Sequence, residues 1–332
     1  MIAIGYGILY AISSAGETLA VKSLNYNSIP LTLPTYTALL SNQLWIFMIP
    51  IYWAQRKERR SLKKTYWGQY IIIGFLTFLI TILRNISVNA IPGSVFSLLI
   101  STSILFNIVL SKLLLKKLFT YWHLAAAAFC VASALSIGIS TLFTDETDLL
   151  GILAAIAAAF FIALMNVTQE YIQPTWDNYT VRIVELTIVS SLIASVFTVV
   201  YGTFAKELVD WSTAILAATQ SREGLVLVTC ISCILPILKL LVRNTKYATI
   251  KHSNAFFFEF AQSSGALLGS IANILVFREA WGIGYGIAIV LMTISFALYA
   301  QTKRVVVMPP PPNYPKGDIS LTNPIVVVPL WK

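Results

Sequence analysis

The sequence contains few charged residues. Only 11% of its 332 residues are Asp, Glu, Lys or Arg, whereas soluble domains carry about 25%. Hydrophobic residues make up 57% of the chain, and its mean hydropathy is +0.77. A chain this long and this apolar cannot cover itself with polar surface. It is therefore expected to lie in a lipid bilayer.

Histidine and cysteine are also scarce. The chain has His123 and His252, together with Cys130, Cys230 and Cys233, and the three cysteines lie in apolar segments. A metal centre needs about four such ligands close together, so the cysteines are predicted to be packing residues. Catalytic motifs of membrane enzymes and the charge rings or filter loops of channels are not evident. We therefore expect neither an enzyme nor a bound cofactor, and a channel is disfavoured.

Long apolar runs dominate the sequence. Each run reaches the length of about 20 residues that a helix needs to cross a bilayer, and no alternating barrel pattern is present. The predicted fold is an all-α membrane protein with ten transmembrane helices. The runs cover 3–22, 34–54, 67–89, 92–115, 120–143, 150–172, 181–204, 224–245, 252–277 and 280–301.

Basic residues gather on one side of these predicted spans. Six lie in the loop 55–66, and nine others fall on the same side if the spans alternate: Lys112, Lys116, Lys117, Arg182, Arg243, Lys246, Lys251, Lys303 and Arg304. The opposite side has Lys22, Lys206, Arg222 and Arg278. The positive-inside rule then places both termini in the cytoplasm. The net charge of +9 is therefore a topology signal, and no nucleic-acid partner is expected.

The two halves of the chain resemble each other weakly. Residues 97–117 can be laid against 259–279, which places Ser101 over Ser263 and Thr102 over Ser264. Each half has five spans, and because five is an odd number the second copy must be inverted in the membrane. Many secondary transporters are built in this way, with the substrate site at the interface between the repeats. We predict a first repeat at 1–143, an inverted second repeat at 144–302, and a disordered Pro-rich cytoplasmic tail at 303–332.

Several stretches resemble a known family. The order of spans and the segment PGSVFSLLISTSILFNIVLSKLLLKK (92–117) resemble the drug/metabolite transporter superfamily. AGETLAVKSLN (15–25) and MNVTQEYIQ (165–173) are most similar to its chloroquine-resistance-transporter-like branch. The resemblance implies proton-coupled, secondary-active transport of small peptides, amino acids or thiols in a vacuolar, lysosomal or other endomembrane. It also places Glu17 where the family tunes substrate charge. A nucleotide-sugar or purine-type carrier is the alternative.

Glu259 is the ionisable residue that we place deepest in a span. It lies in FFFEFAQSSGALLGS (256–270), about two turns inside the ninth run. Ionisable groups at membrane depth are costly and usually functional. Aromatic neighbours would desolvate Glu259, so it is the predicted proton-coupling carboxylate. The alternative is a structural ion pair with Lys239 or Arg84, which occupy matching positions in the two halves.

Other polar residues complete the predicted substrate-binding and coupling set. Glu17 and Glu170 lie near span ends, where each could either face a cavity or reach headgroup water as an interface anchor. The fourth span offers hydroxyls and an amide opposite Glu259. The full set is Glu17, Arg84, Ser97, Ser101, Thr102, Asn107, Asn166, Glu170, Lys239, Glu259, Gln262 and Ser263.

Two further segments predict contacts between proteins. Pro311, Pro312 and Tyr314 form a Pro-Pro-x-Tyr motif, which is either a WW-domain ligand or part of an unstructured tail. Gly282 and Gly286 have the spacing of a close-packing helix face, which predicts a scaffold contact or a homodimer contact.

Overall fold

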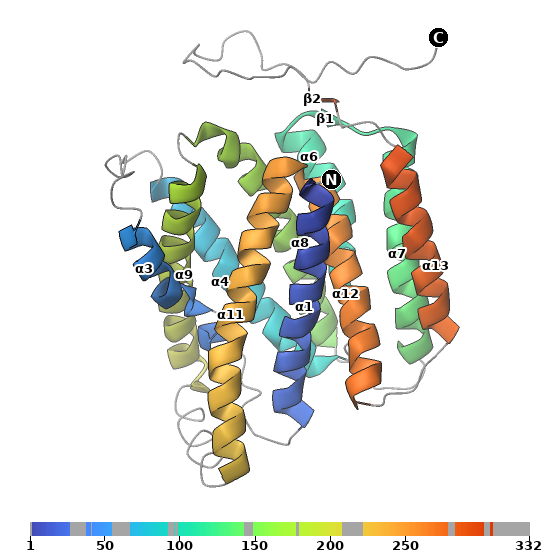
Figure 1. The fold of residues 1–332 in the computed structure, drawn as a ribbon. Coiled ribbons are helices and arrows are strands. Elements are labelled where there is room, and N and C mark those ends of the chain that lie inside the picture. The colour runs from blue at the N-terminus through green and yellow to red at the C-terminus, as the bar shows by residue number, and fades with distance from the viewer. Residues whose placement is uncertain are drawn as a thin grey trace.

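The computed structural model describes residues 2–26, 38–40, 42–54, 67–91, 96, 99–142, 149–176, 179–207, 222–277, 283–301 and 306–307. This part of the chain is nearly all helical (Figure 1). Its long helices are α1 (Ile2–Tyr26), α3 (Leu44–Ala54), α4 (Trp67–Ala90), α6 (Ser103–Leu114), α7 (Tyr121–Leu142), α8 (Leu149–Ile172), α9 (Tyr179–Phe204), α11 (Arg222–His252), α12 (Ala255–Phe277) and α13 (Ile283–Gln301). The short elements are β1 (Lys117–Leu118), the 3-10 helix η3 (Gln173–Thr175) and β2 (Val306–Val307).

Apolar helices of membrane-spanning length are present. Residues Trp67–Val88 of α4, Leu149–Ile172 of α8 and Val181–Phe204 of α9 are long and apolar enough to cross a bilayer. The structure is therefore consistent with an all-helical membrane protein, while the count of ten spans and the inverted halves stay predictions. Helix boundaries differ from the predicted runs at the connection between α11 and α12. The helix α11 continues to His252 instead of ending near residue 245, and α12 begins at Ala255 instead of residue 252.

The helices pack as neighbours in space that are often distant in sequence. Helix α1 contacts α11 and α12, α4 contacts α8 and α9, α6 contacts α8, and α7 contacts α13. Small residues allow two of these approaches: an added Cβ at Gly74 would lie 2.8 Å from Ile193, and one at Gly265 would lie 3.2 Å from the Ala11 Cα atom. By contrast, an added Cβ at Gly286 would meet no atom within 4 Å. Gly286 therefore makes no close packing contact with the described residues, and Gly282 lies outside them.

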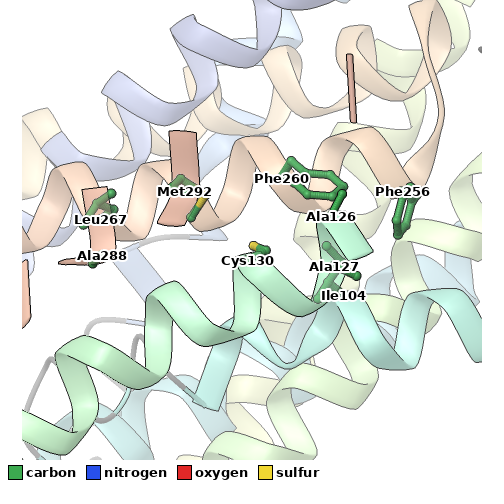
Figure 2. Packing of buried hydrophobic residues seen from close by; sticks show 9 residues of the cluster. All are labelled: Ile104, Ala126, Ala127, Cys130, Phe256, Phe260, Leu267, Ala288 and Met292. Carbon is green, nitrogen blue, oxygen red and sulfur yellow. The ribbon is translucent and has the colours of Figure 1, made fainter. Parts of the chain in front are cut away.

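A buried apolar cluster joins four helices (Figure 2). Ile104 of α6, Cys130 of α7, Phe260 of α12 and Met292 of α13 belong to it. Beside the cluster, hydroxyl groups of α7 and α13 donate hydrogen bonds to carbonyl oxygens of the partner helix. This cluster packs against one side of α12, and α1 and α11 also contact α12.

A short strand pair closes one end of the bundle. Strands β1 and β2 are antiparallel, with Lys117 opposite Val307 and Leu118 opposite Val306. Helix α1 begins and α13 ends at this same end (Figure 1). Residues 306–307 of the predicted tail form strand β2, because β1 offers backbone partners. Pro311, Pro312 and Tyr314 lie outside the described residues.

Candidate functional site

Glu259 is the centre of a buried hydrogen-bond network. It is the fifth residue of α12, one turn from the start of the helix instead of the predicted two, because α12 begins at Ala255. Its side chain is fully buried. Oε2 accepts a hydrogen bond from the Ser103 hydroxyl at 2.5 Å, and Oε1 accepts from the Asn166 amide at 2.6 Å and the Asn107 amide at 3.3 Å. We call these four residues the carboxylate network.

Helical spacing explains how the network forms. Ser103 and Asn107 are four residues apart and therefore lie on one face of α6. Ser111, one turn further along α6, donates to the Asn107 Oδ1 atom at 3.1 Å and fixes the orientation of that amide. Gln262, three residues after Glu259, donates to the Ser103 hydroxyl at 3.5 Å. The sequence thus brings α6, α8 and α12 together around one carboxylate.

One atom of the network is unsatisfied. Asn166 is fully buried, and its Oδ1 atom has no hydrogen-bond partner within the described residues. Buried side-chain acceptors usually have a partner. Asn166 Oδ1 is therefore an acceptor available to a group that the chain itself does not supply.

Glu17 and Lys239 form a separate ion pair. Lys239 Nζ lies 2.6 Å from the Glu17 Oε1 atom, and both side chains are largely buried. Glu17 is therefore not an anchor that reaches headgroup water. The alternative pairing of Glu259 with Lys239 is also wrong in this structure, because Lys239 is paired with Glu17. The cation in electrostatic range of Glu259 is Lys246, two turns further along α11. Arg84 instead lies 5.9 Å from the Phe96 ring.

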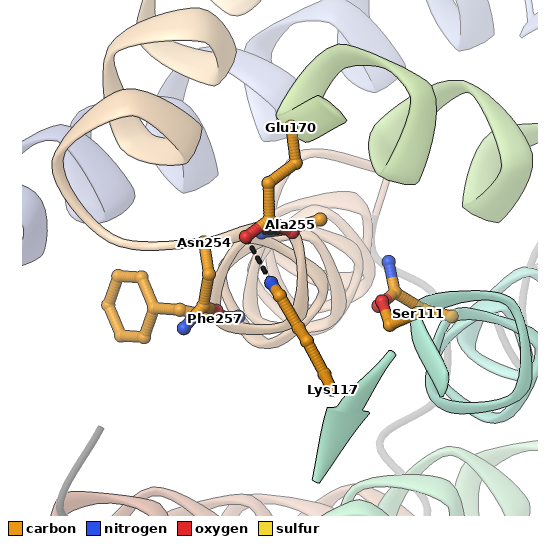
Figure 3. Close-up of polar contacts among 7 residues, drawn as sticks. Ser111, Lys117, Glu170, Asn254, Ala255 and Phe257 are labelled. Carbon is orange, nitrogen blue, oxygen red and sulfur yellow. Dashed lines mark hydrogen bonds and ion pairs between the residues drawn. The ribbon is translucent and has the colours of Figure 1, made fainter. Parts of the chain in front are cut away.

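Glu170 contacts strand β1 and helix α12 at the end of the bundle where the strand pair lies. It pairs with Lys117 of β1 (Figure 3), and its Oε2 atom accepts a hydrogen bond from the Ala255 N–H group at 3.1 Å. The Asn254 side chain caps the same helix start by accepting from the Phe257 N–H group at 2.6 Å. A carboxylate is favourable at a helix N-terminus. Glu170 therefore joins α8, β1 and α12 and is not a simple interface anchor.

The remaining predicted site residues are dispersed. Ser101 and Ser263 are buried, and Ser263 hydrogen-bonds to Cys130. The Thr102 hydroxyl bonds the Leu99 carbonyl of its own turn at 2.5 Å, as membrane hydroxyls often do. Ser97 lies outside the described residues. None of these contacts joins the carboxylate network directly.

Three of the cations that were predicted on the cytoplasmic side are buried among the helices. Lys117, Arg243 and Lys246 are each at most 8% exposed. Arg243 and Lys246 lie inside α11, four and seven residues after Lys239. That spacing is the periodicity of one helix face, and it is the signal that could have placed them in the bundle. Within the described residues, no cluster of three or more His, Cys, Asp or Glu side chains could hold a metal.

Comparison with known proteins identifies the family. The model of the family described as purine nucleobase transmembrane transport matches residues 17–305. The chain belongs to this family. No curated protein matches the sequence. One crystal structure is 12% identical, covers 90% of this chain and 95% of its own, and superposes with a TM-score of 0.64, which shows a shared fold.

Membership of the purine nucleobase transport family indicates a membrane transporter of small solutes. It favours the purine-type carrier over the transport of peptides, amino acids or thiols. The resemblance to the chloroquine-resistance-transporter-like branch and the endomembrane location stay predictions.

Proposed function

We propose that the chain transports a purine nucleobase, which binds at the carboxylate network. The observation that carries this proposal is the juxtaposition of a fully buried glutamate with amides from two other helices, one of which keeps an unsatisfied acceptor. Intramembrane ionisable groups of this kind usually mark substrate or ion pathways. The family match supplies the class of solute.

The chemistry of the network complements a purine. A purine ring presents N–H donors and unprotonated ring nitrogens along one edge. A carboxylate accepts from N–H donors, and an Asn or Gln amide can donate and accept at once along an adenine edge. Glu259 and the amides of Asn107, Asn166 and Gln262 provide both kinds of group. Tyr10 and Phe258, in edge contact at 4.6 Å, supply aromatic surface nearby.

The position of the network suits an alternating-access transporter. Ser103 and Asn107 come from the predicted first repeat, whereas Asn166 and Glu259 come from the predicted second repeat. A site shared by both halves changes its access when one half moves against the other. We infer that the ten predicted helices act in this way, with cytoplasmic termini.

Proton coupling is the second part of the proposal. In the present arrangement Glu259 accepts three hydrogen bonds and donates none. A protonated Glu259 needs an acceptor, and the unsatisfied oxygen of Asn166 provides one if that amide rotates. Protonation therefore changes which network atoms donate and which accept hydrogen bonds to the solute. This change links proton binding to solute binding.

Uptake into proteoliposomes tests the proposed substrate. The full chain would be reconstituted and offered radiolabelled adenine, hypoxanthine, an amino acid, a dipeptide and glutathione, with and without a pH gradient. We expect saturable uptake of the two purines that unlabelled purines suppress. The control is an equal quantity of protein-free vesicles. Uptake of the dipeptide or glutathione without uptake of any purine would contradict the proposal and favour the alternative solute class.

A further inference from the structure

Helix α11 presents a row of buried cations to the helix bundle. Lys239, Arg243 and Lys246 are spaced four and three residues apart, so they share one helix face. Their positions extend over about 10 Å of helix length at 1.5 Å per residue. Lys239 lies at one end of this row in its pair with Glu17, and Lys246 lies at the other end near Glu259. We call the three residues the basic face of α11.

Most of the positive charge has no carboxylate partner. Arg243 donates to the hydroxyls of Ser191 at 2.7 Å and Ser190 at 3.4 Å. Lys246 lies 5.4 Å from the centre of the Phe258 ring. Within the described residues neither of these cations, nor Arg84 on α4, lies within ion-pair distance of a carboxylate. Hydroxyl groups and an aromatic ring contact Arg243 and Lys246, but these groups carry no negative charge to balance the cations.

Buried charges in proteins are normally paired. Here the carboxylates of Glu17 and Glu259 face the cations Lys239, Arg243, Lys246 and Arg84. The region therefore has an excess of two positive charges when every group is ionised. A bound anion would offset this excess of positive charge.

Aromatic surface connects the basic face with the carboxylate network. Tyr10 of α1 is buried, meets Phe258 edge-on, and lies in electrostatic range of Glu17, Arg84 and Glu259. Arg and Lys side chains beside aromatic rings make a favourable setting for a flat, negatively charged ring, since charge and ring surface are offered together.

We propose that the basic face of α11, together with Arg84, binds the anionic form of an oxopurine, a purine whose ring N–H group is acidic enough to ionise near neutral pH. This inference rests on the proposed function and narrows its substrate class. The carboxylate network would receive the N–H edge of the ring, and the basic face would neutralise the oxyanion edge. A neutral aminopurine would use the network alone.

Competition between a neutral and an anionic purine tests this inference. The reconstituted full chain would take up radiolabelled adenine at neutral pH in the presence of increasing urate, an oxopurine anion. We expect urate to compete, and Arg243→Gln to raise the half-inhibitory urate concentration about ten-fold or more, because a charge-assisted hydrogen bond is lost. Adenine uptake by each variant without urate is the reference for its own urate inhibition curve. Arg243→Lys should retain part of the competition, and Lys251→Gln, an exposed cation of α11, should behave as the wild type.

Further measurements keep the inference testable if Arg243→Gln fails to fold. Arg84→Gln should weaken urate competition in the same direction, and urate should raise the melting temperature of the purified wild-type protein. Adenine uptake that urate does not inhibit, with no urate-dependent thermal shift, would overturn the anionic site while leaving the proposed function intact. Equal protection by chloride or phosphate would overturn the oxopurine class. A wild-type protein that takes up no adenine would instead count against the proposed function, whatever urate does.

Discussion

At the scale of single residues, Asn166 is the most informative member of the carboxylate network. Its amide nitrogen donates to Glu259 at 2.6 Å, while its buried amide oxygen has no partner in the part of the chain that the structure describes. An unsatisfied buried acceptor costs free energy in the empty protein. A solute or a proton that supplies the missing donor recovers this cost, and we infer that Asn166 contributes to affinity in this way.

Replacement of Asn166 by Ala should weaken purine binding. The change removes a donor to Glu259 and the unsatisfied acceptor together, and a hydrogen bond to a charged group contributes about 1.5–3 kcal/mol. We expect the KM for adenine uptake to rise about ten-fold or more, with protein abundance retained. The measurement is initial-rate uptake over a range of adenine concentrations.

Ser195→Ala provides the matched control. Its hydroxyl donates to the Ser191 carbonyl of its own helix at 2.9 Å, so its removal should leave the KM unchanged. An unchanged KM in Asn166→Ala as well would place the purine elsewhere in the molecule.

The grouping of residues in the candidate site could be predicted in part from the sequence. Glu259, Asn107 and Asn166 were predicted as members of one set, and the structure places them in direct contact. Thr102 and Ser263 were predicted on equal terms, but the Thr102 hydroxyl bonds the Leu99 carbonyl and Ser263 hydrogen-bonds to Cys130. Which of these side chains reaches Glu259 depends on which face of α6 or α12 is turned inward. A run of hydroxyl residues without a strongly polar face does not predict the direction of that face.

At the scale of elements, the strand-pair end of the bundle is held by the contact of Glu170 with Lys117 and the Ala255 N–H group. Lys117 belongs to β1, whose backbone also pairs with β2 beyond α13. This arrangement connects the ends of α8 and α12 with the connection between α6 and α7. Glu259 lies only one turn of α12 below it.

Glu170→Gln should destabilise this end of the protein. The amide still fits the site, but Lys117 is 4% exposed in its side chain and would lose its only carboxylate contact among the described residues. Breaking a buried ion pair in this manner costs about 3–5 kcal/mol. We expect a lower melting temperature in detergent than for Glu207→Gln, a control near the end of α9. Equal melting temperatures for both variants would show that the Glu170 contact contributes little.

Helix boundaries explain what the sequence could not predict about Arg243 and Lys246. The predicted apolar run ends near residue 245, so Lys246 lies just beyond it and Arg243 lies in its last turn. In the structure α11 continues to His252, and both side chains are buried in the bundle. A long cationic side chain at the end of an apolar run is compatible with either position. Only the contacts with α9 and α12 decide between them.

At the scale of the whole molecule, apolar length and internal packing agree with a membrane transporter. The helix α8 has 24 residues, which at 1.5 Å per residue corresponds to about 36 Å and exceeds the hydrocarbon thickness of about 30 Å. The most polar contacts lie between helices rather than on their outer faces, where large apolar side chains are exposed. Solute specificity, by contrast, could not be predicted from composition, since it depends on a few side chains that meet across helices.

The central claim is that Glu259 couples proton and purine movement, and uphill accumulation tests it most directly. Proteoliposomes that contain either the wild type or Glu259→Gln would receive labelled adenine with an imposed pH gradient, and in parallel would exchange adenine without a gradient. We predict that the wild type accumulates adenine above its external concentration. Glu259→Gln should exchange adenine but fail to accumulate it, with normal protein abundance. Normal pH-driven accumulation by Glu259→Gln would contradict the claim.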